Sequence, residues 1–210
     1  MNCRGHDDRI VPVSTPPRPR SAGSGEPRVP AGPAACPWES SENSLPAVTR
    51  HEATHLAVAL AADVPVRGVR IRPHDSQAGL YVGATLPCAN PPPRIEVVTV
   101  ALAGPVCDGI PWRDLPSGTG DRLVATRVTE RLAGPGAGPG QVEEILDEAY
   151  AAAEGYVLIL AERIAALTVA MSAGNHDQKR FFDADGVQVP ILPACPDHPD
   201  GYCFGRPAGL

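Results

Sequence analysis

Residues 45–62 read LPAVTRHEATHLAVALAA, a stretch dominated by Ala, Val and Leu. A helix that is apolar on all sides is expected to be buried. His51, Glu52 and His55 interrupt this stretch, and burying two imidazoles and a carboxylate without partners costs on the order of several kcal/mol. The stretch therefore predicts a buried helix whose polar side chains share a common partner, such as a bound cation.

The pentapeptide at positions 51–55, HEATH, fits the zinc-binding pattern HExxH. At 3.6 residues per turn His51 and His55 lie on the same face of a helix, so both reach one ion at about 2.0–2.1 Å. Glu52 follows about 100° further round, beside the ion rather than on it. There it can take a proton from a water whose pKa zinc lowers to ~7. The motif predicts Zn²⁺ as the cofactor and Glu52 as the general base.

Catalytic zinc sites usually have three protein ligands and one open position, so a third ligand must lie elsewhere. The extended zincin pattern places another His six residues after the second one, but Ala61 stands there. That class is excluded. The downstream candidates are His74, Asp75, Glu96, Asp108, Asp114 and Asp121.

Composition divides the chain into one folded domain and two tails. The 210 residues include 25 Pro and 21 Gly, unevenly distributed. Residues 1–43 are rich in Pro, Gly, Ser and Arg and lack sustained apolar periodicity, so they cannot bury enough surface to offset the entropy of ordering. We expect a disordered arm over 1–43, one domain over 44–190, and a disordered tail over 191–210. In that tail, Cys195, His198 and Cys203 match no closed four-ligand zinc pattern.

Composition also limits the expected cellular location of the protein and the classes of partner that it binds. No segment has the roughly 18–20 consecutive apolar residues of a membrane span, and the first residues, MNCRGHDDRI, contain no apolar signal-peptide core. We therefore expect a cytoplasmic protein, in which the six cysteines form no disulfide framework. The net charge of −6 and the lack of a basic run argue against nucleic acid as a partner.

Periodicity predicts a mainly α fold with a small β-hairpin or edge-strand region. Residues 66–86 alternate apolar and polar side chains around the turn-rich HDSQAG, a pattern typical of two strands. Ser44 is a candidate N-cap for the first helix, which Asp63-Val64-Pro65 ends. The expected helices cover residues 45–62, 94–107, 119 or 121 to 132, and 141–172. The intervening GPGAGPG is a hinge without a Lys, so it is not a phosphate loop.

Five segments in this order carry a family resemblance: HEATH, VRIRPHDSQAGLYVGAT, LAGPVCDG, SGTGDRLVAT and VEEILDEAYAAAEGYVLILAERIAAL. Together they resemble the protease domain of the FtsH family of ATP-dependent zinc metalloproteases, over residues 45–188. The resemblance implies a helical zinc-peptidase domain that acts on polypeptides.

The resemblance also implies a third ligand. The family uses the two motif histidines and a distant Asp that follows a Gly-rich turn and precedes an Ala-Thr pair, which here is Asp121. An Asp at the start of a helix can direct its carboxylate toward an ion on a neighbouring helix. Asp108 stands where the family has Glu, which implies a supporting role. The alternative for Asp121 is a plain N-cap of the third helix.

The chain departs from the family in two respects. Its only Lys is Lys179, outside any phosphate loop, so these residues do not hydrolyse ATP by themselves. A separate ATPase partner and a homo-oligomer are both left open. Thr54 stands where the family usually has Gly, and a β-branched side chain there could crowd the cleft.

The expected activity is that of a zinc metalloendopeptidase which hydrolyses peptide bonds in unfolded or small polypeptides. The strand region between Gly68 and Gly83 is a candidate edge for pairing with an extended substrate. The alternative is a catalytically weak or inactive, zinc-stabilised binding or regulatory module. Retention of Glu52 favours the enzyme, because a structural zinc site needs no general base.

Overall fold

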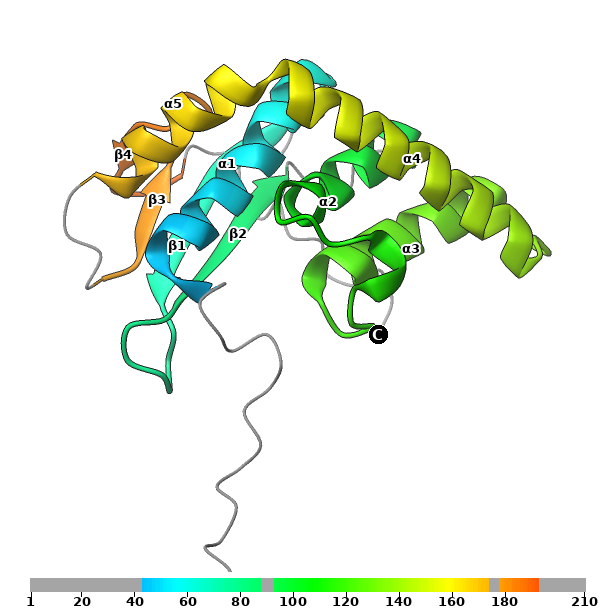
Figure 1. Cartoon of the computed structure of the whole chain (residues 1–210), viewed down its shortest axis with the longest axis horizontal. Coiled ribbons are helices and arrows are strands. Elements are labelled where there is room, and N and C mark those ends of the chain that lie inside the picture. Colours follow the sequence, from blue (N-terminus) through cyan, green and yellow to red (C-terminus); the bar gives the residue numbers. More distant parts are fainter. Residues whose placement is uncertain (1–42, 88–92, 174–177, 193–210) are drawn as a thin grey trace, which may run out of the picture. The chain divides into compact units, whose positions relative to one another are not determined.

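The computed structural model describes residues 43–87, 93–173 and 178–192 (Figure 1). Within this part the fold is mainly helical with a small β region, as the sequence predicts, and it consists of five α-helices and an antiparallel sheet of four strands. Residues 1–42 and 193–210 lie outside the described residues, and with them lie most of the predicted arm and tail, including Cys195, His198 and Cys203.

Helix α1, Leu45–Ala61, is the buried helix that the opening stretch predicts. The Ser44 side chain accepts a hydrogen bond from the Ala47 N–H at 3.4 Å and caps the first turn. Every residue from 52 to 59 is buried. The helix ends just before Asp63, which has a positive φ of 52°. α1 packs against the sheet on one side and against α2 and α5 elsewhere, so it lies at the centre of the fold.

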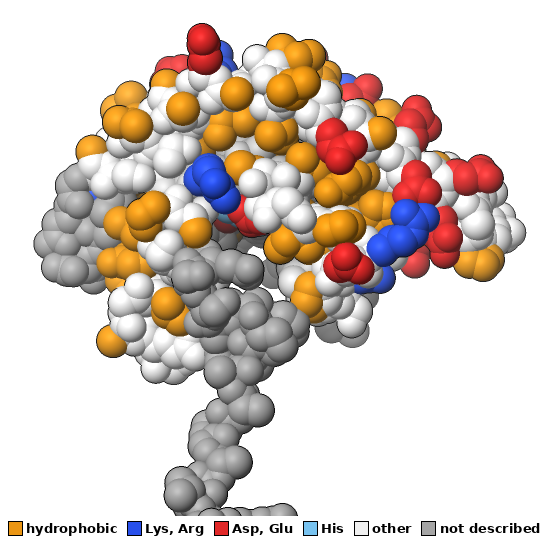
Figure 2. Space-filling view, viewed as in Figure 1, with side chains coloured by type: hydrophobic (Ala, Val, Ile, Leu, Met, Phe, Trp, Pro, Cys, Tyr) orange, Lys and Arg blue, Asp and Glu red, His pale blue; other side chains and the backbone are white. Residues whose placement is uncertain are grey.

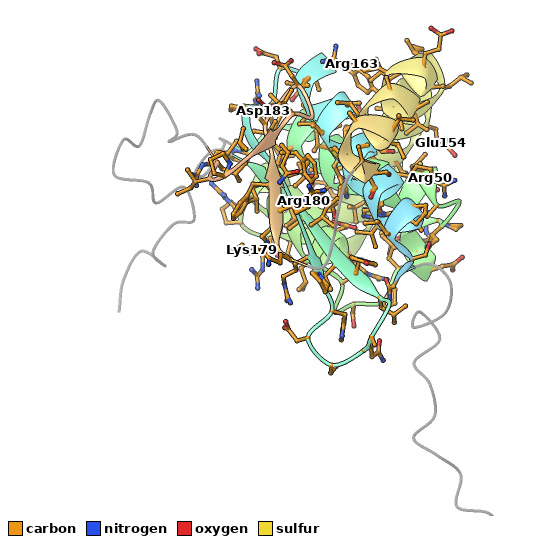
Figure 3. The ribbon with its side chains drawn as sticks, turned by 90° about the vertical axis from the view of Figure 1, so that its left-hand side faces the viewer. Arg50, Glu154, Arg163, Lys179, Arg180 and Asp183 are labelled. Atoms are coloured by element: carbon orange, nitrogen blue, oxygen red, sulfur yellow. The ribbon has the colours of Figure 1, made fainter. Side chains whose placement is uncertain are left out.

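The sheet has the strand order β2-β1-β3-β4. The predicted hairpin forms from β1, Val66–Pro73, and β2, Tyr81–Pro87, and β2 lies at one edge. β3, Arg180–Phe182, and β4, Gln188–Val189, add two strands that the sequence analysis did not predict, because segments this short carry no readable alternation. Figure 3 shows Lys179 and Arg180 at the beginning of β3 and Asp183 just beyond its end.

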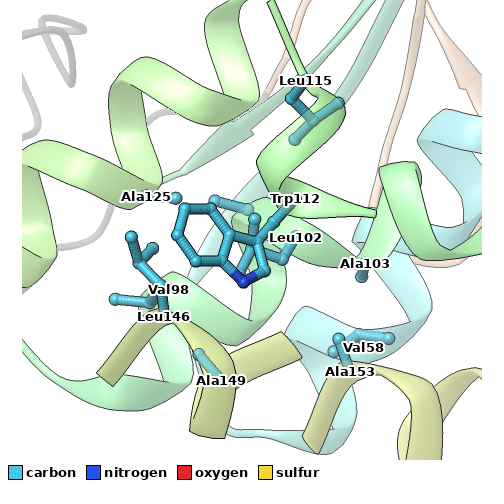
Figure 4. Packing of buried hydrophobic residues seen from close by; sticks show 11 residues of the cluster. Val58, Val98, Leu102, Ala103, Trp112, Leu115, Ala125, Leu146, Ala149 and Ala153 are labelled. Carbon is cyan, nitrogen blue, oxygen red and sulfur yellow. The ribbon is translucent and has the colours of Figure 1, made fainter. Parts of the chain in front are cut away.

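A second group of helices packs around Trp112. It consists of α2 (Ile95–Cys107), the short 3₁₀ helix η2 (Trp112–Asp114), α3 (Gly120–Ala133) and α4 (Pro139–Ile159). The Trp112 ring packs among apolar side chains of α2, α3 and α4, including Leu102 and Leu146 (Figure 4). Its Nε1 donates to Asp147 Oδ1 at 2.8 Å. This packing joins α3 to α2 and thereby sets where the start of α3 lies.

The prediction of one helix over residues 141–172 is wrong. The structure has two helices, α4 and α5 (Ala161–Ser172), which are bent by 76° at Leu160. Their apolar stripes belong to different clusters: Leu146 of α4 packs with α2, whereas Leu167 of α5 packs with α1 and the sheet. Tertiary packing thus overrides a continuous local pattern. α4 also begins at Pro139, inside the predicted hinge, where proline suits a first helical turn.

The outer side of this bend is apolar. Leu158 and Ile159 are 79% and 80% exposed, and Figure 2 shows hydrophobic side chains along α4 and α5. In the described part of the chain no single helix meets the length and hydropathy of a membrane span, although α4 and α5 taken together do. At the C-terminal end Leu192 is buried, so the folded part extends two residues beyond the predicted boundary at 190.

Candidate metal centre

Two helices bring the predicted ligands together. α1 places His51 and His55 one turn apart, with their Nε2 atoms 3.0 Å from each other. α3 supplies Asp121, whose Oδ2 lies 3.2 Å from His51 Nε2 and whose Oδ1 lies 3.5 Å from His55 Nε2. One ligand atom from each residue fits within a span of 4.8 Å. Residues 70 positions apart in the chain therefore meet at one point.

Asp121 reaches this point from the first turn of α3. The N-cap residue of α3 is Thr119, so the alternative prediction that Asp121 caps this helix is wrong. The Thr119 hydroxyl donates instead to the Pro116 carbonyl at 3.0 Å, within the turn that precedes the helix. The Asp121 carboxylate is thus free of a capping role and faces α1.

The other nitrogen of each imidazole meets an acceptor on or just after α2. His51 Nδ1 lies 2.6 Å from Asp108 Oδ2, and His55 Nδ1 lies 2.6 Å from the Val100 carbonyl oxygen. A carboxylate and a carbonyl can only accept, so we assign the Nδ1 proton to both neutral rings. This assignment leaves both Nε2 lone pairs facing Asp121. Asp108 contacts the Nδ1 side of the His51 ring and is not part of the group of possible metal ligands.

With this assignment, the point where these side chains meet contains several electron pairs but no hydrogen-bond donor. Two Nε2 lone pairs and the Asp121 carboxylate oxygens face one another within hydrogen-bond distance. Such an arrangement is repulsive unless a proton or a cation lies between the groups. Two imidazoles and one carboxylate are a suitable set of ligands for Zn²⁺, which takes three protein ligands in catalytic sites.

Without a metal, protons on the histidine rings relieve this repulsion. Burial lowers the pKa of His51, but hydrogen bonds to Asp108 and Asp121 outweigh burial and hold the pKa well above its ordinary value. Burial likewise lowers the pKa of His55, and attraction to Asp121 outweighs it. For Asp121, burial raises the pKa, but attraction to His55 and hydrogen bonds to both rings hold it far below its usual range.

Gly104 of α2 leaves open the space beside both ligand nitrogens. A β-carbon at this position would lie 2.4 Å from His51 Nε2 and 2.5 Å from His55 Nε2. Any larger residue would occupy the side of the rings on which an ion binds. The sequence analysis noted the LAGP segment but did not assign this role, because it depends on how closely α2 approaches α1.

Glu52 lies beside the cluster and is held by the edge strand. Its side chain is 5% exposed, and its Oε2 accepts a hydrogen bond from the Thr85 hydroxyl at 2.7 Å. A β-carbon at Gly83 would lie 2.4 Å from Glu52 Cγ and 2.5 Å from Oε1. Gly83 and Thr85 are therefore functional candidates that the sequence analysis missed. Their small size and their spacing by two on β2 were the only signals.

The remaining predicted candidates lie outside the cluster. Among the described residues only His51, His55 and Asp121 form such a group of possible metal ligands. Asp75 pairs with Arg72, and the His74 ring accepts a hydrogen bond from the Ser76 N–H. Glu96 lies in the first turn of α2 and Asp114 in η2.

Thr54 does not narrow the cleft in the way its β-branched side chain suggests. It is fully buried, and its hydroxyl donates to the Arg50 carbonyl at 2.8 Å within α1. It lines neither of the two cavities at the site.

Two cavities meet at the cluster, and both are lined by Glu52, Gly83, Gly120 and Asp121. We call the first, of about 360 Å³, the valine cavity, because it is lined by Val64, Val66, Val97, Val100 and Val124. We call the second, of about 530 Å³, the acidic cavity, because Asp108 and Asp114 join Glu52 and Asp121 there. β2 borders both, so its edge passes the cluster.

No protein-family model, no curated protein and no solved structure matches the chain.

The arrangement predicts that Asp121 and Asp108 affect metal binding to different degrees. Asp121→Asn removes an anionic ligand, whereas Asp108→Asn removes only the negative charge of the acceptor that orients His51, and changes to such outer partners typically cost about 10–100-fold in affinity. We expect one Zn²⁺ per chain in the parent protein and a larger loss of affinity for Asp121→Asn than for Asp108→Asn. Competition with a chromogenic chelator measures this. Asp114→Asn, which changes an exposed carboxylate of the acidic cavity, is the control. Equal affinities for the Asp121 and Asp114 variants would contradict the ligand assignment.

The histidine pKa shifts predict opposite pH responses with and without metal. Both folded-state values lie above the unfolded value of about 6.5. Their contribution to stability is therefore complete below about pH 6.5 and is lost as the pH rises through the folded pKa. Zinc requires deprotonated rings, so its stabilisation should grow over the same range. We expect the gap in Tm between zinc-loaded and chelator-treated protein to widen from pH 6 to pH 9. His74→Ala should leave this widening intact, and a gap independent of pH would refute the prediction.

Proposed function

We propose that this chain is a zinc metalloendopeptidase that hydrolyses peptide bonds in unfolded or small polypeptides. The observation that carries the proposal is the convergence of three electron-rich side chains without a donor, with a buried carboxylate beside them. The resemblance of five segments to the FtsH protease domain supports the same chemistry. We accordingly propose descent from a peptidase domain of that kind.

His51, His55 and Asp121 would hold the ion, which supplies a Lewis acid for the scissile carbonyl and acidifies the attacking water. Glu52 takes the proton from that water and passes it to the leaving amine nitrogen. The Thr85 hydroxyl donates a hydrogen bond to Glu52 Oε2, so we assign the proton exchange to Oε1. Gly83 keeps the space beside Oε1 clear for the water.

The free edge of β2 is suited to hold an extended substrate. In the described part of the chain β2 pairs with β1 alone, so its outer backbone groups are available for another strand. The edge borders both cavities and passes Glu52. A peptide added to this edge would make main-chain hydrogen bonds that do not depend on sequence, which suits unfolded substrates. We therefore propose β2 as the pairing edge, which overlaps the predicted region between Gly68 and Gly83 only at its first residues.

The rival hypothesis, an inactive zinc-stabilised module, explains the ligands but not Glu52. A structural zinc site is closed by four ligands, whereas this cluster opens on two cavities. The Thr54 substitution, which first favoured the rival, leaves both cavities untouched. A separate ATPase, a homo-oligomer and a cytoplasmic location stay predictions.

The decisive variant is Glu52→Gln, which keeps shape and hydrogen-bonding capacity but removes the base. We expect zinc-loaded parent protein to cleave casein, a chelator to abolish cleavage, and the variant to lose roughly 100-fold or more in rate. Zinc content and Tm should stay unchanged. Glu96→Gln is the control, since Glu96 lies outside the cluster. Equal cleavage by parent and Glu52→Gln proteins, or none by either despite one bound zinc, would sink the enzyme proposal.

Pairing with β2 predicts a two-residue period in the substrate. Methylating one backbone nitrogen of a peptide removes one N–H donor, and alternate N–H groups of an added strand point at the edge. Binding to zinc-loaded Glu52→Gln protein, measured by fluorescence anisotropy, should weaken several-fold to about tenfold at every second position. A uniform response along the peptide would argue against strand addition.

A further inference from the structure

The valine cavity contains a single guanidinium, that of Arg70, among walls that are mainly aliphatic. On β1 the neighbours of Arg70, Val69 and Ile71, are buried in the cluster that includes Leu56 of α1. Side chains alternate along a strand, so Arg70 belongs to the opposite face of the sheet. It pairs with Ala84 of β2. Because the Ala84 side chain is small, the longer Arg70 side chain can extend across the edge strand to the cavity that it lines.

Arg70 differs from the neighbouring arginines in having no side-chain partner among the described residues. Within the described residues no hydrogen bond, ion pair or ring contact involves its side chain. Arg72, two residues along on the same face, is paired with Asp75, and Arg67 donates to the Leu192 carbonyl at 3.5 Å. Arg70 is nevertheless half-buried, so it is not simply a solvated surface charge.

The two acidic groups that share this cavity make contacts with other residues. Glu52 accepts from Thr85 through Oε2, and Asp121 faces the two histidines. The other walls are mainly valine and leucine side chains, which cannot accept a hydrogen bond, and the Thr85 hydroxyl and the His55 ring that also line the cavity already contact Glu52, Val100 and His51. Among the described residues the guanidinium therefore has no acceptor, and a molecule that enters the cavity is in a position to supply one.

We propose that Arg70 selects a substrate carboxylate in the valine cavity, so that the peptidase prefers peptides with an acidic group beside the bond that is cut. A guanidinium presents a planar fork of N–H groups that matches a carboxylate, and such charge-assisted pairs are among the stronger polar contacts. A cavity of about 360 Å³ accommodates one large side chain. The carboxylate comes either from an acidic side chain or from the C-terminus of the peptide. This inference rests on the proposed peptidase function.

Binding to zinc-loaded Glu52→Gln protein tests the inference without turnover. A peptide series carries Glu, Gln or Lys at one position at a time, and a second series carries a free or an amidated C-terminus. At one position Glu should bind roughly tenfold or more tightly than Gln. If the preference instead follows the free C-terminus, the terminal carboxylate is the ligand. Either pattern supports the proposal.

Three variants, each made in the Glu52→Gln protein, assign the preference to Arg70. Arg70→Ala should remove it, and Arg70→Glu should reverse it in favour of Lys. Arg72→Ala, on the same strand and face but outside the cavity, should retain it. Zinc content and Tm are measured for each, so that a folding defect is recognised. A preference that survives Arg70→Ala, or equal binding of Glu, Gln, free and amidated peptides, would overturn the proposal. Absence of casein cleavage by the zinc-loaded parent protein would instead contradict the enzyme proposal, whatever the peptide-binding assay shows.

Discussion

The mutual repulsion of three electron-rich groups is the constraint on which the rest of the site depends. His51, His55 and Asp121 place lone pairs against one another within about a hydrogen-bond length, which a fold tolerates only with a cation or protons between them. The surrounding elements are organised to keep the arrangement. The Val100 carbonyl and Asp108 hold the ring tautomers, and the missing side chain of Gly104 keeps the space open. These supports come from α2 or from the residue that follows it, so the packing of α1 on α2 is what makes the site.

The part of this structure that could be predicted from sequence is the part encoded locally. The apolar composition of helix α1 predicts a buried helix, and the spacing of its two histidines predicts that they lie on one face. Asp121 was singled out among six candidates by the resemblance to the FtsH protease domain, whose third ligand follows a Gly-rich turn at a helix start. The hairpin could be found because seven or eight residues of alternation are enough to recognise a strand.

What could not be predicted depends on long-range contacts. The bend at Leu160 follows from which partner each half of the helix packs against, and the local pattern is the same on both sides of it. Gly104, Thr85 and Arg70 acquire their roles only when strands and helices distant in sequence meet. β3 and β4 are held by pairing with β1 and each other rather than by their own length. A two- or three-residue strand leaves no pattern to detect.

The exposure of the candidate ligands bears on whether the cluster is a reactive or a structural site. The His55 side chain is 6% exposed, that of His51 22% and that of Asp121 31%, so the cluster is most open at Asp121. The valine cavity reaches His55, the acidic cavity reaches His51, and both reach Asp121. A fourth ligand from the protein would have to enter through one of these cavities, and in the described residues no further His, Cys, Asp or Glu joins the group. Glu52 lines both cavities beside the cluster, where its carboxylate is placed to move a proton if an ion binds. The two cavities and the placement of Glu52 therefore support the proposed catalytic site, in which one position is left for water or substrate, over a closed structural site.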